Sequence, residues 1–339
     1  MLFNAQQWEE IALLLKQSSK IAITTHRNPD GDAIGSTMAL SAFLSQHYST
    51  DVCVILPDPC PQYLLFLTQN RRFFDFTNHP ADAKDYLQNC DLLFCLDYNN
   101  PSRTGAIEDL VRICSLRAKS IMLDHHPQPE SFVSYLGSDT HASSTCELVY
   151  EFCKHLGMNP IPPADIAASI YTGIMTDTGS FRFSVTKPNT HKIAEHLLQS
   201  GIRHWEIHEN LFNQNSIEKL KLWGLALKDR LEWIAESSVA FIALSAADLK
   251  ANHYKEGDLE GLVNYALSIS GSKMGVLFSE RDDKIRISFR SVGDFSANRF
   301  ARTFFEGGGH ENAAGGVYNG TLDNAVSHLK KSLHEFVDQ

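Results

Sequence analysis

The chain has 339 residues, of which 43 % are hydrophobic, and it carries a formal net charge of −10. This length favours two domains, each large enough to bury its own core. The negative charge argues against a long basic track for duplex or extended single-stranded nucleic acid, while a small anionic ligand could still bind a local cluster of positive charge.

The sequence contains no signal for a membrane or for export. No apolar run approaches the roughly 18 residues of a membrane span, and residues 1–20 predict an amphipathic helix rather than a signal peptide. The seven cysteines form no CxxC pair, so we expect buried thiols in a reducing compartment and no zinc finger. We therefore expect a soluble cytoplasmic protein with no membrane partner, and the sequence leaves open whether it forms a homodimer.

Short apolar runs alternate with helical patterns through the first half of the chain. The expected strands are residues 21–25, 52–56, 92–96 and 121–123, and a helical stripe is clearest at 146–153. Alternation of this kind predicts a parallel sheet covered by helices. We expect an N-terminal doubly wound α/β domain over residues 1–187.

The pattern changes after Pro188. Residues 188–228 are polar and helix-like and predict a connector, and a smaller C-terminal α/β domain is expected over 229–339. Its expected strands are 239–244, 274–278 and 284–289. In the last of these, apolar and polar residues alternate, so Arg290 should point away from the packed face.

Acidic and histidine side chains follow three of the expected strands. They are His26, Asp30 and Asp32 after the first, Asp97 after the third, and Asp124, His125 and His126 after the fourth. The carboxyl ends of strands in an open α/β sheet gather along one edge, so these side chains should converge. Asp30 lies in a good turn and helix-cap sequence, but the same residue types at three strand ends favour a binding site.

Converging carboxylates raise one another's pKa unless positive charge compensates them. Two divalent cations would balance four aspartates: Asp30, Asp32, Asp97 and Asp177. Oxygen ligands mixed with two imidazoles favour Mn²⁺, with Mg²⁺, Co²⁺ or Zn²⁺ as alternatives. Paired ions of this kind activate water and hold phosphoryl oxygens during in-line displacement.

A glycine run near residue 308 suggests a second binding element. Its backbone could approach an anion closely, and a helix beginning after it would add a positive dipole end. The alternative is a helix C-cap, for which one glycine suffices. The run lies near Arg290 and Ser291 at a strand end, so we expect a nucleotide or terminal-phosphate pocket formed by Arg290, Ser291, Gly308, Gly309 and His310.

These motifs resemble the DHH/DHHA1 phosphoesterases. The resemblance runs through residues 26–36, Asp97, the triplet 124–126, Asp177 and the segment 307–315. It implies one metal held by His26, Asp30, Asp97 and Asp177, and another held by Asp32, Asp97, His125 and Asp177. It also implies that Asp97 bridges the metals, that Asp124 orients neighbouring ligands, and that His126 contacts the scissile phosphate. Arg103 is assigned to phosphate, the alternative being a surface ion pair with Glu108 or Asp109.

The two-domain layout is most similar to bacterial members of the family that act on short RNA and on 3′-phosphoadenosine-5′-phosphate (pAp). This implies hydrolysis of short oligoribonucleotides to 5′-mononucleotides, of pAp to AMP, or of both, in a cleft between the domains. One alternative is a phosphodiesterase for cyclic or linear dinucleotides. Another is a nucleotide-binding regulator without activity. The sequence does not fix the cleavage polarity.

Overall fold

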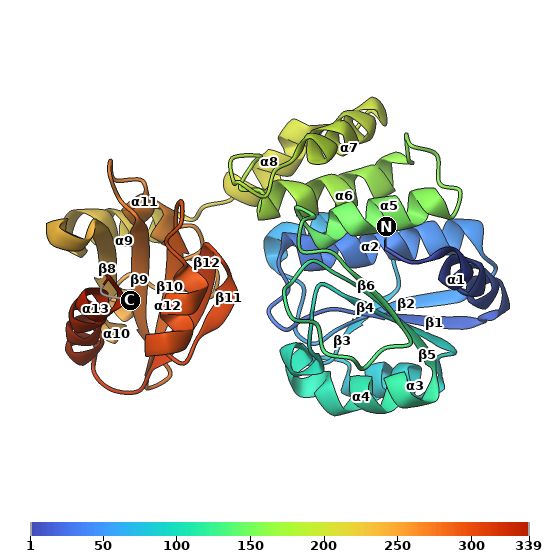
Figure 1. The fold of residues 1–339 in the computed structure, drawn as a ribbon, viewed down its shortest axis with the longest axis horizontal. Coiled ribbons are helices and arrows are strands. Elements are labelled where there is room, and N and C mark those ends of the chain that lie inside the picture. Colours follow the sequence, from blue (N-terminus) through green and yellow to red (C-terminus); the bar gives the residue numbers. More distant parts are fainter. Residues whose placement is uncertain (1, 338–339) are drawn as a thin grey trace. The chain divides into compact units, whose positions relative to one another are not determined.

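The computed structural model describes residues 2–337, and the chain divides between Gln214 and Asn215 into two compact units (Figure 1). The segment expected as a connector is divided between them. Helices α7 (Pro188–Gln199) and α8 (His204–Phe212) bury residues such as Leu197 in the first unit, whereas α9 (Ile217–Asp229) buries Leu222 in the second. Apolar stripes on these helices pack onto the two cores, so no separate helical connector forms. No helix in the described range has the length and apolar character needed to cross a membrane.

The first unit is built on a six-stranded parallel sheet with strand order β3-β2-β1-β4-β5-β6. The strands are β1 (Lys20–Thr24), β2 (Asp51–Leu56), β3 (Phe73–Asp75), β4 (Leu92–Leu96), β5 (Lys119–Asp124) and β6 (Tyr135–Ser138). The four expected strands are present, and β3 and β6 are additional. This architecture confirms the predicted doubly wound domain.

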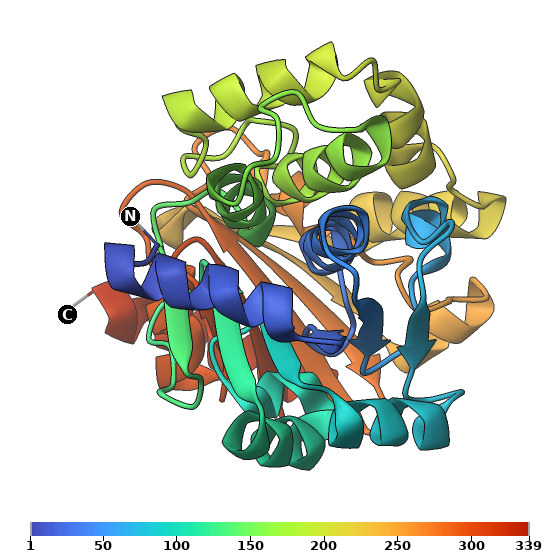
Figure 2. The same ribbon diagram turned by 90° about the vertical axis from the view of Figure 1, so that its right-hand side faces the viewer.

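Helices cover both faces of this sheet, as Figure 2 shows. Alternate strand residues such as Ile23 and Phe94 pack against α1 (Ala5–Gln17), α2 (Gly31–His47), α5 (Thr145–His155) and α6 (Ala164–Asp177). Their neighbours Ala22 and Cys95 face α3 (Pro80–Asn89) and α4 (Glu108–Arg117). Because both faces are buried, the strands are apolar at nearly every position.

The strand order reverses between β1 and β4, which lie side by side. The chain leaves β1 toward β2 on one side of this point, and it leaves β4 toward β5 on the other. Open α/β sheets bind ligands at such a switch point, outside the carboxyl ends of the strands. A ligand-binding site is therefore expected at the loops after β1, β4 and β5.

The second unit contains a mixed sheet with strand order β11-β12-β10-β9-β8-β7. Its strands are β7 (Leu231–Ile234), β8 (Val239–Leu244), β9 (Met274–Arg281), β10 (Lys284–Ser291), β11 (Gly308–His310) and β12 (Ala313–Tyr318). One face packs on α12 (Ala297–Phe304) and α13 (Leu322–Val337), and the other on α9, α10 (Ala246–Ala251) and α11 (Val263–Leu267). The predicted smaller α/β domain is confirmed.

Candidate metal centre

The loop after β1 carries three of the expected site residues into α2. Asp30 is the N-cap of α2, and its Oδ1 accepts hydrogen bonds from the amides of Asp32 and Ala33, each at 3.0 Å. His26 approaches Asp30 Oδ1 through its Nε2 atom at 3.9 Å. Asp30 is therefore a helix cap, as its local sequence also allowed, and it lies beside His26 as well.

Asp97 occupies the centre of the cluster. It follows β4 in the left-handed region, with a φ of 64°, and only 2 % of its surface is exposed. Its Oδ2 lies 3.3 Å from His26 Nε2, and its Oδ1 lies 3.6 Å from His125 Nε2. The two oxygens of one carboxylate therefore face two different imidazoles.

His125 connects the remaining candidate ligands. Its Nε2 lies 3.3 Å from Asp177 Oδ2 at the end of α6, and 3.9 Å from Asp32 Oδ2. Asp32 is fully buried. Asp32 on α2, Asp97 after β4 and Asp177 on α6 are far apart in the sequence and thus converge on one imidazole nitrogen.

The orientation of His26 is set by a backbone contact. Its Nδ1 lies 2.8 Å from the carbonyl oxygen of Arg27, which can only accept, so Nδ1 carries the proton. Nε2 is then the atom that faces Asp30 and Asp97. A hydrogen bond from the distal nitrogen to a carbonyl is the usual way in which proteins orient a metal-binding histidine.

Burial and neighbouring charges shift the pKa values of the carboxylates in this cluster. Burial, followed by the negative charges of its neighbours, raises the pKa of Asp32 well above its ordinary value, and the same causes act on Asp177. Burial alone would also raise the pKa of Asp97, but the contact with His26 lowers it overall. Negative charge at this sheet edge exceeds what the surrounding protein compensates, a condition that favours cation binding.

The donor atoms fit divalent cations. Ligand atoms of His26, Asp30 and Asp97 lie within 4.8 Å of one another, and so do those of Asp32, Asp97 and His125. Donors that share one ion at about 2.1 Å are separated by roughly 3 to 4 Å, close to the spacings around His125 and Asp97. Asp97 belongs to both groups, and the cluster could hold two ions.

Asp124 and His126 form a buried pair beside these groups. His126 Nδ1 lies 2.7 Å from Asp124 Oδ1. Burial lowers the pKa of His126 to about 3, and burial together with the charge of Asp97 raises the pKa of Asp124 to about 7. The imidazole of His126 is therefore neutral near pH 7.

Arg103 lies in the 3₁₀ segment Pro101–Ile107 that follows β4. Its carbonyl oxygen accepts a hydrogen bond from the amide of Arg27 at 2.8 Å, which ties this segment to the His26 loop. The charge of Arg103 is near enough to work against the upward shift in the pKa of Asp177. Glu108, considered as its surface partner, pairs instead with Arg112 at 2.9 Å.

In the second unit, Arg290 and His310 flank the same residue. Arg290 on β10 pairs with Ala313 on β12, and His310 on β11 pairs with Ala313 from the other side. Directly paired residues in a sheet project to the same face, and two strand spacings amount to about 10 Å. Arg290 and His310 therefore share one face of the sheet across a small residue.

The glycine run is a strand and is not followed by a helix. Gly308 and Gly309 form β11 with His310, and β12 comes next, so the expected helix dipole is absent from this position. A Cβ on Gly309 would lie 2.5 Å from the carbonyl oxygen of Ala313, so close strand pairing requires glycine there. Ser291 is buried, and its hydroxyl donates to the carbonyl of Phe295 at 2.6 Å.

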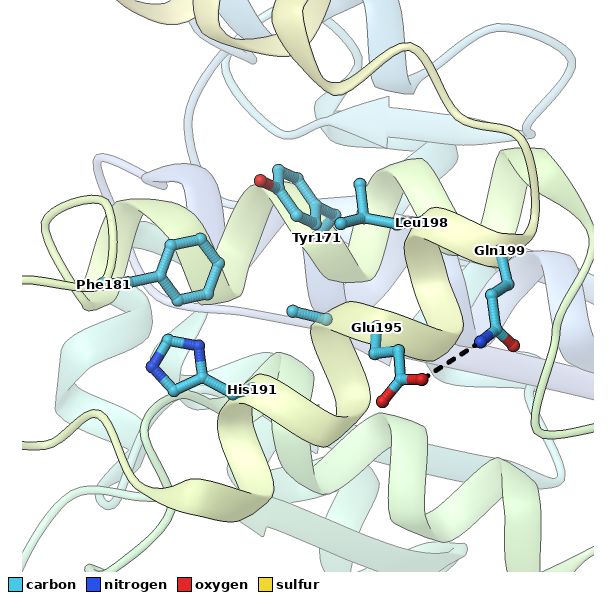
Figure 3. Close-up of a pocket in the computed structure, with 7 residues that line it drawn as sticks. Tyr171, Phe181, His191, Glu195, Leu198 and Gln199 are labelled. Atoms are coloured by element: carbon cyan, nitrogen blue, oxygen red, sulfur yellow. Dashed lines mark hydrogen bonds between the residues drawn. The ribbon is translucent and has the colours of Figure 1, made fainter.

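A surface hollow with a volume of about 540 Å³ lies elsewhere in the first unit (Figure 3). Its lining is mostly apolar, with Tyr171, Phe181 and Leu198 contributing, and its one carboxylate, Glu195, accepts a hydrogen bond from Gln199 at 3.3 Å. A hollow without a cluster of donors cannot perform the chemistry expected of the Asp97 cluster.

Sequence patterns predicted a helix at 146–153 but no role at the site for the first turn of α5. Thr145 and Cys146 contact Asp32 and Asp97 there. The residues before this helix, Ser143 and Ser144, are a recognisable capping signal. The contact with Asp32 spans 113 positions, and no local pattern could predict it.

Comparison with known proteins identifies the family of both units. Residues 20–174 match the N-terminal domain of the DHH family, and residues 238–339 match the DHHA1 domain. The bifunctional oligoribonuclease and PAP phosphatase NrnA of Thermus thermophilus is 30 % identical over 97 % of this chain and 94 % of its own length. The Bacillus subtilis protein of the same name is also 30 % identical, over 87 % and 88 %.

A solved structure extends the likeness to the fold. The crystal structure of an exopolyphosphatase-related protein from Bacteroides fragilis has a TM-score of 0.93 and 33 % identity, and covers 98 % of this chain and 97 % of its own. Its similarity spans both units. The chain therefore belongs to the DHH/DHHA1 family of phosphoesterases.

Proposed function

We propose that this protein is a two-metal phosphoesterase that hydrolyses short oligoribonucleotides to 5′-mononucleotides, pAp to AMP, or both. The observation that carries the proposal is the position of Asp97, whose Oδ2 faces His26 at 3.3 Å while its Oδ1 faces His125 at 3.6 Å. A carboxylate with its two oxygens turned to two donor groups is suited to bridge a pair of ions. The names of the relatives from T. thermophilus and B. subtilis support the substrate class.

Two ligand sets are proposed. His26, Asp30, Asp97 and Asp177 would hold one ion, and Asp32, Asp97, His125 and Asp177 the other. Mn²⁺ suits this mixture of oxygen and imidazole donors, with Mg²⁺, Co²⁺ or Zn²⁺ as alternatives. Bound ions would supply a water of lowered pKa and positive charge for the phosphoryl oxygens.

Three further residues of the first unit are proposed to act on the substrate or on its neighbours in the site: Asp124, His126 and Arg103. Asp124, hydrogen-bonded to His126 at 2.7 Å, fixes the orientation of that imidazole. His126 then contacts the scissile phosphate, and Arg103 adds a positive charge beside it. Preorganised groups of this kind stabilise charge that develops at the reacting centre.

The second unit is proposed to bind the nucleotide. Arg290 and His310 share a sheet face across Ala313, a spacing of about 10 Å that suits a phosphate and a base or sugar of one nucleotide. Gly308 and Gly309 keep the backbone of the edge strand accessible to a close ligand. Ser291 acts through the loop that it holds by its hydrogen bond to Phe295.

Short substrates are favoured by charge. At a net charge of −10 the protein repels a long polyanion except where bound metals and the basic residues concentrate positive potential. We expect efficient cleavage of RNAs of about two to five nucleotides, a range that the family resemblance implies, and a steep decline on longer strands.

One metal-screened assay tests the proposal. Purified protein is incubated with Mn²⁺, Mg²⁺, Co²⁺ or Zn²⁺ and with pAp, a linear dinucleotide, a cyclic dinucleotide, pyrophosphate or an RNA ladder up to about 25 nucleotides. Fastest turnover of pAp or of the shortest RNAs is expected. Preference for the cyclic dinucleotide would make the chain a cyclic dinucleotide phosphodiesterase, and nucleotide binding without turnover in any metal would make it a regulator.

A further inference from the structure

The first turn of α5 contacts two of the candidate metal-binding carboxylates at once. The amides of Thr145 and Cys146 donate to Asp32 Oδ2 at 2.6 Å and to Asp32 Oδ1 at 2.8 Å. The hydroxyl of Thr145 donates to Asp97 Oδ1 at 3.0 Å. Thr145 is therefore bonded to Asp32 through its backbone and to Asp97 through its side chain.

These contacts lie in a fully buried setting. Thr145 and Asp32 are completely shielded from solvent, and Asp97 is nearly so. Unpaired amides at a helix N-terminus, together with the helix dipole, favour a carboxylate in this position. The backbone bond from Cys146 counteracts part of the rise that burial and neighbouring charge cause in the pKa of Asp32.

The turn that carries Thr145 is itself anchored. Ser144 is the N-cap of α5 and accepts from the amide of Glu147 at 3.1 Å. The buried carboxylate of Glu147 in turn accepts from the amide of Ser143 at 3.2 Å and from the hydroxyl of Thr190 on α7 at 3.0 Å. These bonds hold the turn on both sides. Thr145 therefore stays in place when Asp32 or Asp97 moves.

We propose that Thr145 is a positioning residue which sets the separation and orientation of Asp32 and Asp97 for metal binding. The proposal rests on the ligand roles given to both aspartates above. One anchored residue that bonds both carboxylates holds two mutually repelling groups at a fixed distance before any ion arrives. Loss of its hydroxyl removes the hydrogen bond that orients Oδ1 of Asp97 and leaves the backbone bond to Asp32 in place.

The test compares three variants of the full chain, each stripped of metal with a chelator. Thr145→Val removes the hydroxyl and keeps the shape, and Thr145→Ser keeps the hydroxyl. Thr172→Val is the matched control, because Thr172 is equally buried and its hydroxyl donates to the carbonyl oxygen of Ala168 at 2.8 Å, within its own helix. Mn²⁺ affinity is measured by isothermal titration calorimetry, and kcat and KM are measured separately on a linear dinucleotide.

We expect Thr145→Val to weaken Mn²⁺ binding about 10- to 100-fold, the usual effect of losing a group that orients a metal ligand. The kcat of this variant should fall more than its KM rises, because Thr145 is buried and does not contact the substrate. Thr145→Ser and Thr172→Val should bind Mn²⁺ like the unmodified chain. Thermal melts in chelator check that each variant is folded.

Two results would overturn the proposal. One is Mn²⁺ affinity in Thr145→Val equal to that of the unmodified chain. The other is a Thr145→Ser variant that is folded but binds Mn²⁺ as weakly as Thr145→Val, which would mean that the hydroxyl does not carry the effect. If Thr145→Val does not fold, the comparison of Thr145→Ser with the unmodified chain decides. A protein that binds Mn²⁺ but hydrolyses no nucleotide would refute the proposed function and leave this calorimetric comparison valid.

Discussion

Gly173 on α6 lies directly against the carboxylate of Asp32. A Cβ at position 173 would come within 2.6 Å of Asp32 Oδ1 and would also overlap the sulfur of Cys146. We expect Gly173→Ala to push Asp32 or α5 aside and to cost about 1 to 3 kcal/mol of unfolding free energy, the usual effect of overpacking. Urea denaturation measures this loss, and Mn²⁺ titration should show weaker binding.

Gly224 provides the control for this substitution. It lies inside α9, and an added Cβ would meet nothing within 4 Å. Gly224→Ala should therefore raise stability by about 0.4 to 1 kcal/mol, because alanine is the better helix former. Equal effects of the two substitutions would mean that the contact with Asp32 is not a tight one.

The central position of Asp97 predicts a large effect of removing its charge. Asp97→Asn keeps the shape of the side chain, and we expect turnover to fall at least about 10²-fold, the scale for losing one preorganised electrostatic group. Asp91→Asn is the control, since Asp91 lies just before the opposite end of β4 and accepts from Ser19 and Lys20. Near-normal turnover of Asp97→Asn with Mn²⁺ present would exclude a bridging role.

The pairing of Arg290 and His310 across Ala313 predicts a dependence on substrate type. Arg290→Ala and His310→Ala should lower activity on pAp and on short RNA but spare a small artificial phosphodiester, because only the natural substrate uses remote binding energy for positioning. Arg286→Ala is the control on the same strand, where Arg286 pairs with Asp282 at 2.8 Å. Equal losses on both substrate types would place these residues in the chemistry or in the fold.

An ion pair in the second unit predicts a pH-dependent stability. Asp248 accepts from the Nη2 and Nε atoms of Arg230 at 2.8 and 3.0 Å, and these bonds hold the pKa of Asp248 at about 2. A carboxyl whose folded pKa is depressed contributes stability above its unfolded pKa of about 4 and loses it as the pH falls toward 2.

Asp248→Asn should therefore cost about 1 kcal/mol at pH 7, after allowance for the partial exposure of Arg230. About half of this difference should remain near pH 3. Chemical denaturation of both proteins at several pH values measures it. A difference that does not change with pH would mean that packing, and not charge, is responsible.

In the first unit, the strands that could be predicted are the ones buried on both faces. Continuous apolar runs mark β4 and β5, whereas β3 has three residues and β6 is a short edge strand that contains a glycine. The strand β12 was missed for a different reason. Its sequence, AAGGVY, has little intrinsic preference for a strand and forms one only because β10 and β11 pair with it.

The candidate ligands could be predicted because strand ends gather at one edge, which places His26, Asp97 and His125 together whatever the details of the loops. The contacts that hold these ligands in position could not be predicted. Thr145 and Gly173 act on Asp32 through the packing of helices far along the chain. Such contacts depend on helix positions that periodicity does not specify.

The left-handed backbone of Asp97 has a consequence for how the protein could evolve. A φ of 64° is costly for most residues with a side chain and is readily adopted by glycine. Selection for folding alone would therefore accept Asp97→Gly, which relieves the backbone and removes a charge that repels Asp32 and Asp177. Laboratory evolution toward thermostability, without a screen for turnover, should enrich inactive chains at this position.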